Sequence, residues 1–207
     1  MNQVPYADEY SPERLFWGTE PGSLVARHIA LLQEGFVLDI GCGEGKNAVY
    51  LARHGARVIA VDRSAVALRN FEGQPEFRES RKRISRIHAD VRQLWFTPGC
   101  FDAIVAYGLL HCFPDWRQAE AMIQAMKAWT RTGGVHIIAA LTSNIPLDRS
   151  VHPYLSEDGL LPVGVIQALY SDSNIIHLQQ AALTETHPTS AKAHTHGIVR
   201  AAILVND

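Results

Sequence analysis

The sequence predicts an α/β fold in which a doubly wound, mostly parallel sheet carries helices on both faces. Short apolar runs rich in β-branched residues alternate with stretches of helical period from residue 36 to residue 141, which is typical of successive βαβ units. Two further apolar runs follow near the end of the chain, which favours a closing antiparallel pair there. A chain of 207 residues can bury a sizeable core, and we expect one domain over residues 1–207.

The expected elements of the first two thirds follow in order along the chain. The strands are "FVLDI" (36–40), "ARVIAVD" (56–62), "SRIHAD" (85–90), "FDAIVAYG" (101–108) and "GVHIIAAL" (134–141). The helices are "KNAVYLARHG" (46–55), "SAVALRNFEG" (64–73) and "DWRQAEAMIQAMKAWT" (115–130). The last helix carries an apolar stripe at three- and four-residue spacing, which predicts core packing, and the glycines of "RTGG" (131–134) end it.

The last third of the chain is less regular. "TSNIPLDRSVHPYLSEDGLLP" (142–162) predicts a loop with a short helix, and we expect it to form a lid that faces a substrate. "SNIIHLQQAALTE" (173–185) and "HGIVRAAILV" (196–205) are the closing pair. We therefore expect N-terminal cap helices in 1–34, a cofactor-binding half in 35–142, and a lid and substrate-facing half in 143–207.

Composition excludes several classes of protein. With 47% hydrophobic residues, 19% charged residues and a net charge of −2, the chain is neither disordered nor a globally basic nucleic-acid binder. Its three cysteines form no C-x-x-C pair, which argues against a disulfide framework or a structural zinc site. We find no signal peptide and no apolar run long enough to span a bilayer, so we expect a cytoplasmic protein that is not bound to a membrane.

The stretch "VLDIGCGEGKNAVYLARHGARVIAVD" (37–62) decides most of the functional interpretation. A phosphate-binding P-loop needs a glycine five residues before Gly45, where Ile40 stands, and a Ser or Thr where Asn47 stands. A dinucleotide fingerprint needs Gly or Ala where Lys46 stands. What remains is a glycine turn between a strand and a helix, which lets backbone approach a ligand at the helix N-terminus.

Acidic residues near this turn narrow the choice of ligand. Asp39 and Glu44 flank it, and Asp62 and Asp90 each end a later strand. Because parallel strands end at one edge of a sheet, these carboxylates should surround the ligand and would repel a pyrophosphate. A ligand with a sulfonium, an ammonium and ribose hydroxyls suits them, with Asp62 on the ribose diol and Asp90 on the adenine amino group. The predicted cofactor is S-adenosylmethionine.

The same motifs, with "ADVRQL" (89–94) and "FDAIVAYGLLHCF" (101–113), resemble class I S-adenosylmethionine-dependent methyltransferases. "FWGTEP" (16–21) and Asn47 make the chain most similar to the tellurite-resistance and thiopurine branch. The resemblance implies a seven-stranded sheet of order 3-2-1-4-5-7-6 with the seventh strand antiparallel. It also implies that Asp39, Gly41, Gly43 and Gly45 hold the methionine moiety, Asp62 and Arg63 the ribose, Asp90 and Val91 the adenine, with Tyr107 near the methyl group.

Aromatic residues of the N-terminal segment are the expected cover of the cofactor pocket. Tyr6, Tyr10, Phe16 and Trp17 either form this cap or pack on the outside of the sheet, and the sequence leaves both possibilities open. We name Trp17 and Asn47 among the cofactor-binding residues.

Methyl transfer from a sulfonium needs mainly alignment, and a base only when the nucleophile arrives protonated. Candidates for a base or an anion site are His111, His152, His194, His196 and Arg200, and we name Tyr107, His111, His196 and Arg200 as catalytic candidates. His111 is equally a packed histidine by sequence. For "AHTHGIVR" (193–200) we favour a solvated loop entering an edge strand over an oxyanion or carboxylate site.

We expect no metal, because His-x-His has no third histidine or carboxylate at ligand spacing. The expected partner is a small-molecule methyl acceptor, and the chain is a monomer or a homodimer. Two alternatives stay open. One is a non-catalytic S-adenosylmethionine sensor. The other, less favoured, is a nucleic-acid methyltransferase that uses the basic run "RESRKRISR" (78–86), for which a solvated connection is the commoner explanation.

Overall fold

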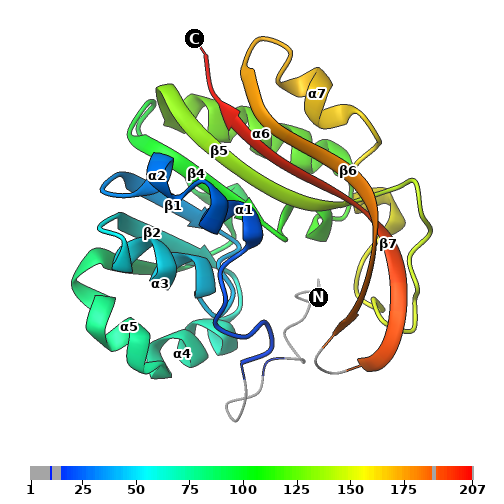
Figure 1. Cartoon of the computed structure of the whole chain (residues 1–207), viewed down its shortest axis with the longest axis horizontal. Helices are drawn as coiled ribbons and strands as arrows, with labels where there is room; N and C mark the ends of the chain where they lie inside the picture. The colour runs from blue at the N-terminus through cyan, green and yellow to red at the C-terminus, as the bar shows by residue number, and fades with distance from the viewer. Residues whose placement is uncertain (1–9, 11–14, 188–189, 207) are drawn as a thin grey trace.

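The computed structural model describes residue 10 and residues 15–187 and 190–206. Within these residues the chain forms one sheet of seven strands in the order β3-β2-β1-β4-β5-β7-β6 (Figure 1). The strands are β1 Phe36–Ile40, β2 Arg57–Asp62, β3 Ile84–His88, β4 Phe101–Tyr107, β5 Thr130–Thr142, β6 Asn174–His187 and β7 Ser190–Leu204. The predicted strand order is confirmed.

Pairing between strands follows the predicted directions. β1 pairs in parallel with β2 and β4, β2 with β3, and β4 with β5. β7 is antiparallel to both β5 and β6. The carboxyl ends of β1, β2 and β4 therefore lie at one edge, which is where ligands bind in such sheets.

Helices cover both faces of the sheet (Figure 1). The described α-helices are α1 Ser23–Arg27, α2 Ile29–Leu32, α3 Lys46–Arg53, α4 Ala65–Gly73, α5 Pro75–Ser80, α6 Trp116–Trp129 and α7 Val165–Leu169. One buried cluster packs residues of α1 to α5 against the sheet, and a second packs α6 and α7 against the opposite face. The predicted stripe of α6, which includes Met122, Ile123 and Met126, lies fully inside the second cluster.

The turn from β1 into α3 is set by glycines. Gly41, Gly43 and Gly45 all have positive φ, at 66°, 53° and 83°. A Cβ on Gly45 would stand 2.3 Å from the Phe71 ring, so this position needs both the left-handed backbone and the missing side chain. The turn thereby brings the backbone of residues 41–45 to the sheet edge.

Some boundaries differ from the sequence-based expectation. α6 ends at Trp129, just before "RTGG" (131–134), as predicted. "RTGG" itself belongs to the start of β5, where the pairing with β4 is irregular between Phe101 and Ala103. Gly133 has a φ of 72° and Gly134 does not have a positive φ. β6 and β7 both extend beyond their predicted ranges, so the hairpin projects past the end of β5 (Figure 1).

The basic run 78–86 is not a solvated connection throughout, contrary to the simpler expectation. Arg86 bonds the Leu68 carbonyl at 2.8 Å, pairs with Glu72 at 3.1 Å, and stacks on Phe77 with 4.8 Å from the guanidinium to the ring centroid. Arg83 bonds the Gly55 carbonyl. These two guanidinium groups are engaged in holding the β3 region in place.

Two general features complete the fold. In the part of the chain that the structure describes, we find no helix that is long and apolar enough to cross a membrane. Cys42, Cys100 and Cys112 are free thiols, as the sequence predicts.

Candidate functional site

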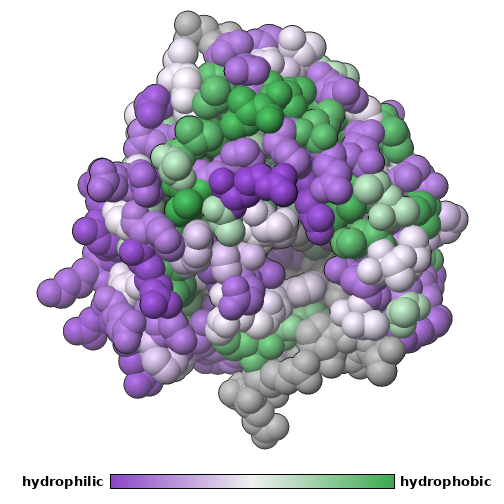
Figure 2. Space-filling view, viewed as in Figure 1, coloured by the Kyte–Doolittle hydropathy of each residue, from purple (hydrophilic) through white to green (hydrophobic). Residues whose placement is uncertain are grey.

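A cavity of about 470 Å³ opens at the carboxyl edge of the sheet. Its volume lies in the range of small-molecule sites, about 300–1,000 Å³. In Figure 2 this face of the molecule is mostly polar and is hollowed near its middle. The wall includes most of the predicted cofactor residues, namely Trp17, Gly41, Gly43, Asn47, Asp62, Arg63, Asp90, Val91 and Tyr107, together with His111, His196 and Arg200.

Asp39 and Gly45 are placed differently from what the sequence suggests. Neither belongs to the described wall of the cavity, since Asp39 is buried within β1 and Gly45 is turned onto Phe71. Asp39 is 1% exposed, and burial, with the nearby Asp62 charge, raises its pKa to about 8. Gly45 packs on Phe71. Their positions indicate support of the turn rather than direct contact with a ligand.

Asp62 stands at the end of β2 with its carboxylate bound to the turn. Oδ2 accepts from the Gly43 N–H at 2.7 Å and Oδ1 from the Ser64 N–H at 2.7 Å. Burial raises the pKa of Asp62, and these backbone hydrogen bonds oppose the rise. Each carboxylate oxygen has a second lone pair, so both can accept one more hydrogen bond from the cavity.

Asp90 follows β3 and is held by Arg92. The Arg92 guanidinium donates to Oδ1 at 3.0 Å and to Oδ2 at 2.5 Å, and this pair lowers the pKa of Asp90. Val91, next to it, is buried and lines the cavity. Asp90 is therefore an ionised acceptor that Arg92 holds in place at the cavity.

Glu44 and Asn47 hold the N-terminal segment, a function that the sequence analysis did not predict. Glu44 Oε2 accepts from the Phe16 N–H at 2.7 Å and from the Trp17 N–H at 3.4 Å. Asn47 Oδ1 accepts from the Gly22 N–H at 2.8 Å. Glu44 Oε1 also accepts from the Asn70 side-chain amide at 2.9 Å, so both carboxylate oxygens are engaged by protein groups although Glu44 lines the cavity.

The N-terminal aromatics fall on the cavity side. Trp17 and Tyr10 line the cavity, and Phe16 is buried edge-to-face against Trp17 at 4.6 Å between ring centroids. Tyr6 lies outside the described residues. For the described aromatics, the structure supports the cap over packing on the outside of the sheet.

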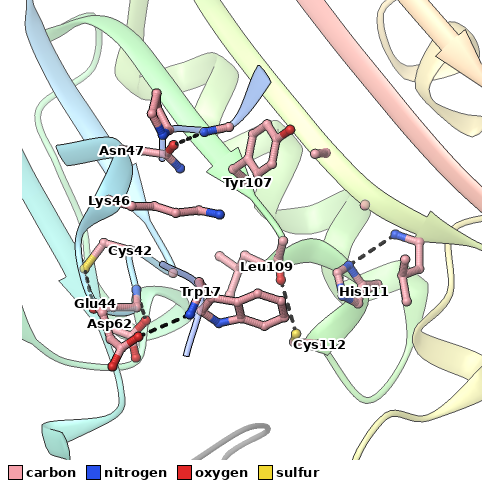
Figure 3. A pocket seen from close by; sticks show the side chains of 18 of the residues that line it. Trp17, Cys42, Glu44, Lys46, Asn47, Asp62, Tyr107, Leu109, His111 and Cys112 are labelled. Carbon is pink, nitrogen blue, oxygen red and sulfur yellow. Dashed lines mark hydrogen bonds between the residues drawn. The ribbon is translucent and has the colours of Figure 1, made fainter. Parts of the chain in front are cut away.

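Lys46 is a wall residue that the sequence analysis treated only as a mismatch to a dinucleotide motif. It begins α3, and its side chain extends into the cavity between Asn47 and Trp17 (Figure 3). Burial lowers its pKa, while Asp39 and Glu185 act in the opposite direction. A cation in the first turn of a helix adds to the positive end of the helix dipole, so the two together favour an anionic group of a ligand.

Tyr107 and His111 mark the middle of the cavity. Tyr107 ends β4, and its ring packs so closely on Gly22 that a Cβ there would stand 2.5 Å from it. His111 lies in a 3₁₀ turn, Leu110–Cys112, and its Nδ1 accepts from the Leu141 N–H at 3.2 Å (Figure 3). Burial and the neighbouring His152 and His196 lower its pKa to about 3. His111 is therefore neutral, with its proton on Nε2.

The "AHTHGIVR" segment is not a solvated loop, which corrects the favoured interpretation. His194 and His196 belong to β7 and are 5% and 3% exposed. His152, 2% exposed, packs against both from the predicted lid, with ring centroids at 5.1 and 5.7 Å. His196 Nε2 lies 3.0 Å from Glu185 Oε1 of β6. The premise that no third histidine or carboxylate lies nearby was wrong, because the fold supplies both.

The predicted lid docks on the hairpin by a second contact. Asp148 accepts from the Lys192 ammonium at 2.7 Å, and from the Ser150 N–H at 3.0 Å. These contacts hold the pKa of Asp148 below its usual range. The segment thus contacts β7 at Lys192 as well as at the histidine group.

Comparison with known proteins agrees with this geometry. Residues 37–134 match the Methyltransferase domain family. An uncharacterized methyltransferase of Mycobacterium tuberculosis is 39% identical over 109 residues, which cover 53% of this chain and 52% of that protein. The match thus spans about half the length of that relative. The ubiquinone biosynthesis O-methyltransferase of Psychrobacter arcticus is 26% identical, over 86% of this chain and 78% of that protein.

Among solved structures, TehB from Haemophilus influenzae has a similar fold. Its TM-score is 0.76 at 19% identity, with 96% of this chain and 65% of that chain covered. The resemblance to class I S-adenosylmethionine-dependent methyltransferases is confirmed by the domain match and the strand order, and the likeness to TehB is one of fold.

Proposed function

We propose that this chain transfers a methyl group from S-adenosylmethionine to a small-molecule acceptor. The observation that carries the proposal is one continuous cavity with two chemically different ends. One end has the glycine turn, Asp62 and Asp90, and the other has His111, His196 and Arg200. A cofactor and an acceptor placed at these ends would meet near Tyr107.

The residues at the first end fit the cofactor's groups. Asp62 would accept from the ribose hydroxyls with its remaining lone pairs, and Asp90 from the adenine amino group. Lys46 and the backbone N–H groups of the turn would bind the methionine carboxylate. The buried Oδ2 of Asp39, which has no hydrogen-bond partner among the described residues, would support the ammonium from behind the turn. Gly41, Gly43 and Arg63 would contact the same ligand.

The cap would close the site over the bound cofactor. Trp17, whose amide is held by the Glu44 carboxylate, lies against the glycine turn, with Cδ1 3.9 Å from where a Cβ on Gly43 would stand (Figure 3). Its ring would exclude water from the sulfonium, which strengthens the attraction of nearby carboxylates. Bound cofactor would in turn favour this position of the segment.

Transfer itself is an in-line displacement. The acceptor's lone pair forms the new bond to the methyl carbon while the sulfonium keeps the electron pair of the broken S–C bond, which yields S-adenosylhomocysteine. Alignment supplies most of the barrier reduction. Neutral His111 would donate a hydrogen bond from Nε2, so it positions an acceptor and is poorly suited to be the base. The His196–Glu185 pair is the better candidate for proton removal, and Arg200 for an anionic group.

A transfer assay tests this function directly. Purified protein is incubated with methyl-labelled S-adenosylmethionine and a panel of thiols, selenite, tellurite, carboxylates and amines. We expect label in at least one acceptor and a loss of about tenfold or more in Arg200→Met. Arg131→Met, which removes a surface ion pair with Asp102, is the matched control and should retain activity.

The alternatives give different results in the same assay. Cofactor binding without transfer to any acceptor would favour the sensor and contradict catalysis. Transfer to RNA or DNA, with a steep salt dependence, would favour the nucleic-acid alternative. We propose a small molecule because Arg83 and Arg86 of the basic run are already engaged by protein groups.

A further inference from the structure

Three buried histidines come together where the lid segment meets the β6–β7 hairpin. His152 comes from the lid and His194 and His196 from β7, and one ring nitrogen from each lies within 4.8 Å of the other two. None of the three is more than 5% exposed. Two segments far apart in the sequence thus place three imidazoles around one point inside the protein.

We propose that His152, His194 and His196 bind a divalent transition-metal ion, with Zn²⁺ the best match. Imidazole nitrogen suits zinc, copper, nickel and iron, whereas calcium and magnesium prefer oxygen ligands. Three protein ligands are also the number found in zinc sites that keep a fourth position open for water or substrate. The burial of the group shields it from bulk water.

The spacing of the nitrogens is close to what a metal requires. Tetrahedral zinc with Zn–N bonds of about 2.0–2.1 Å places its nitrogens about 3.4 Å apart. The three nitrogens lie within 4.8 Å of one another, a spacing from which small rotations of the rings would reach this geometry. The rings of His152 and His196 are already nearly parallel, at 22°.

The surroundings also resemble the outer shell of a metal site. Metal-binding histidines commonly donate their second N–H to a carbonyl or a carboxylate, which fixes the ring. His194 Nδ1 lies 3.4 Å from the Lys192 carbonyl, and His196 Nε2 lies 3.0 Å from Glu185 Oε1. This arrangement assigns Nε2 of His194 and Nδ1 of His196 as the ligating atoms.

The site adjoins the acceptor end of the cavity. His152 and His196 line the cavity and His194 lies behind them, so the open coordination position faces His111 and Arg200. With the metal bound, His196 would be a ligand rather than a base, and a thiol or other acidic acceptor would bind there as the anion and release its proton to solvent. The metal-bound anion would then take the methyl group from the sulfonium. This role at the acceptor end rests on the proposed function, whereas metal binding itself does not.

Direct metal titration tests the site. Protein without a polyhistidine tag is freed of metal by a chelator and titrated with Co²⁺ and Zn²⁺ in a non-coordinating buffer near neutral pH. We expect one equivalent to bind and Co²⁺ to show the strong visible absorption of a tetrahedral site. His194→Gln should abolish both, whereas His54→Gln, an exposed histidine on α3's C-terminal end, should change neither.

A second variant separates a built site from simple histidine affinity. Glu185→Gln should weaken metal binding by about 10- to 100-fold, as loss of an outer-shell carboxylate does elsewhere. Equal metal binding by the wild type and His194→Gln, or no binding by folded wild-type protein, would overturn the proposal. S-adenosylmethionine titrated into the same metal-free sample reports the cofactor end separately, so failure of the metal site and failure of the methyltransferase proposal are distinguishable.

Discussion

Two buried histidines make the stability of this protein sensitive to mild acid. Burial lowers the pKa values of His111 and His136 to about 3. His136 lies in the core between the Thr130 and Tyr170 hydroxyls, at 2.8 and 2.6 Å. Both rings are neutral in the folded state, and unfolding lets them take up protons at their ordinary pKa.

These two histidines make the free energy of unfolding depend on pH. Below pH 6.5 the unfolded state binds more protons than the folded state, so the free energy of unfolding falls as pH drops towards 3, by about 1.4 kcal/mol per pH unit for each histidine. Between pH 7 and pH 5 the wild type should therefore lose free energy of unfolding, and we expect His111→Asn to reduce this loss by about 2 kcal/mol. The Asn Oδ1 can still accept from the Leu141 N–H. Urea unfolding at the two pH values measures the loss, and an unchanged loss would contradict a neutral His111.

At Gly45, both the backbone conformation and the neighbouring Phe71 ring require a residue without a side chain. Gly45→Ala would place a side chain at φ 83° and 2.3 Å from the Phe71 ring. Left-handed strain and overpacking together should lower the free energy of unfolding by about 2–5 kcal/mol. Gly73→Ala is the control, because Gly73 has an ordinary φ and open space around it, and urea unfolding should show little change. Equal effects of the two substitutions would contradict the geometry.

Some residues of the candidate site were predictable from the sequence and others were not. Asp62, Asp90 and Tyr107 were predictable as cavity residues because each ends or follows a strand, and parallel strands end at one edge. His152 was predicted as a candidate but not as a neighbour of His194, since a loop has no periodicity that fixes where it lies. For Lys46 the sequence signal is a cation directly after the glycine turn, which predicts contact with an anionic group of a ligand. The same residue also departs from the dinucleotide fingerprint, and only that departure entered the prediction.

At the scale of elements, helices and strands of the parallel part were predictable from their apolar period. The α6 stripe and the β1–α3 turn lie where the sequence places them. The length of the β6–β7 hairpin was not, because polar residues such as Thr186 and Lys192 continue the strands beyond the apolar runs. Thr186 is exposed and Lys192 binds Asp148 of the lid, so the hydrophobic pattern does not report them.

The N-terminal segment offers a test at the same scale. Glu44→Ala removes the acceptor for the Phe16 and Trp17 amides. We expect the cap to loosen, which should weaken S-adenosylmethionine binding by about tenfold, the equivalent of one charged hydrogen bond, and speed hydrogen exchange at the Phe16 amide. Glu44→Gln keeps an acceptor oxygen and should stay close to wild type. Unchanged affinity and exchange in Glu44→Ala would show that this clamp does not control the site.

For the whole molecule, the sheet brings the ends of five strands and a lid around one cavity. The class of fold was predictable from the alternation of strands and helices, and the strand order from the resemblance to class I methyltransferases. The division into three functional regions and a monomeric or dimeric state stay predictions. So does the acceptor, because its end of the cavity is built from the lid and hairpin, the parts with the weakest sequence pattern.

The central claim is that this cavity binds S-adenosylmethionine, and calorimetric titration tests it most directly. We expect S-adenosylmethionine and S-adenosylhomocysteine to bind with micromolar affinity. Asp62→Ala should lose this binding, whereas Asp172→Ala, which removes an exposed ion pair with Lys127, should retain it. Thermal unfolding confirms that each variant is folded. No heat of binding with folded wild-type protein, or equal affinity in Asp62→Ala, would contradict the assignment of the cavity.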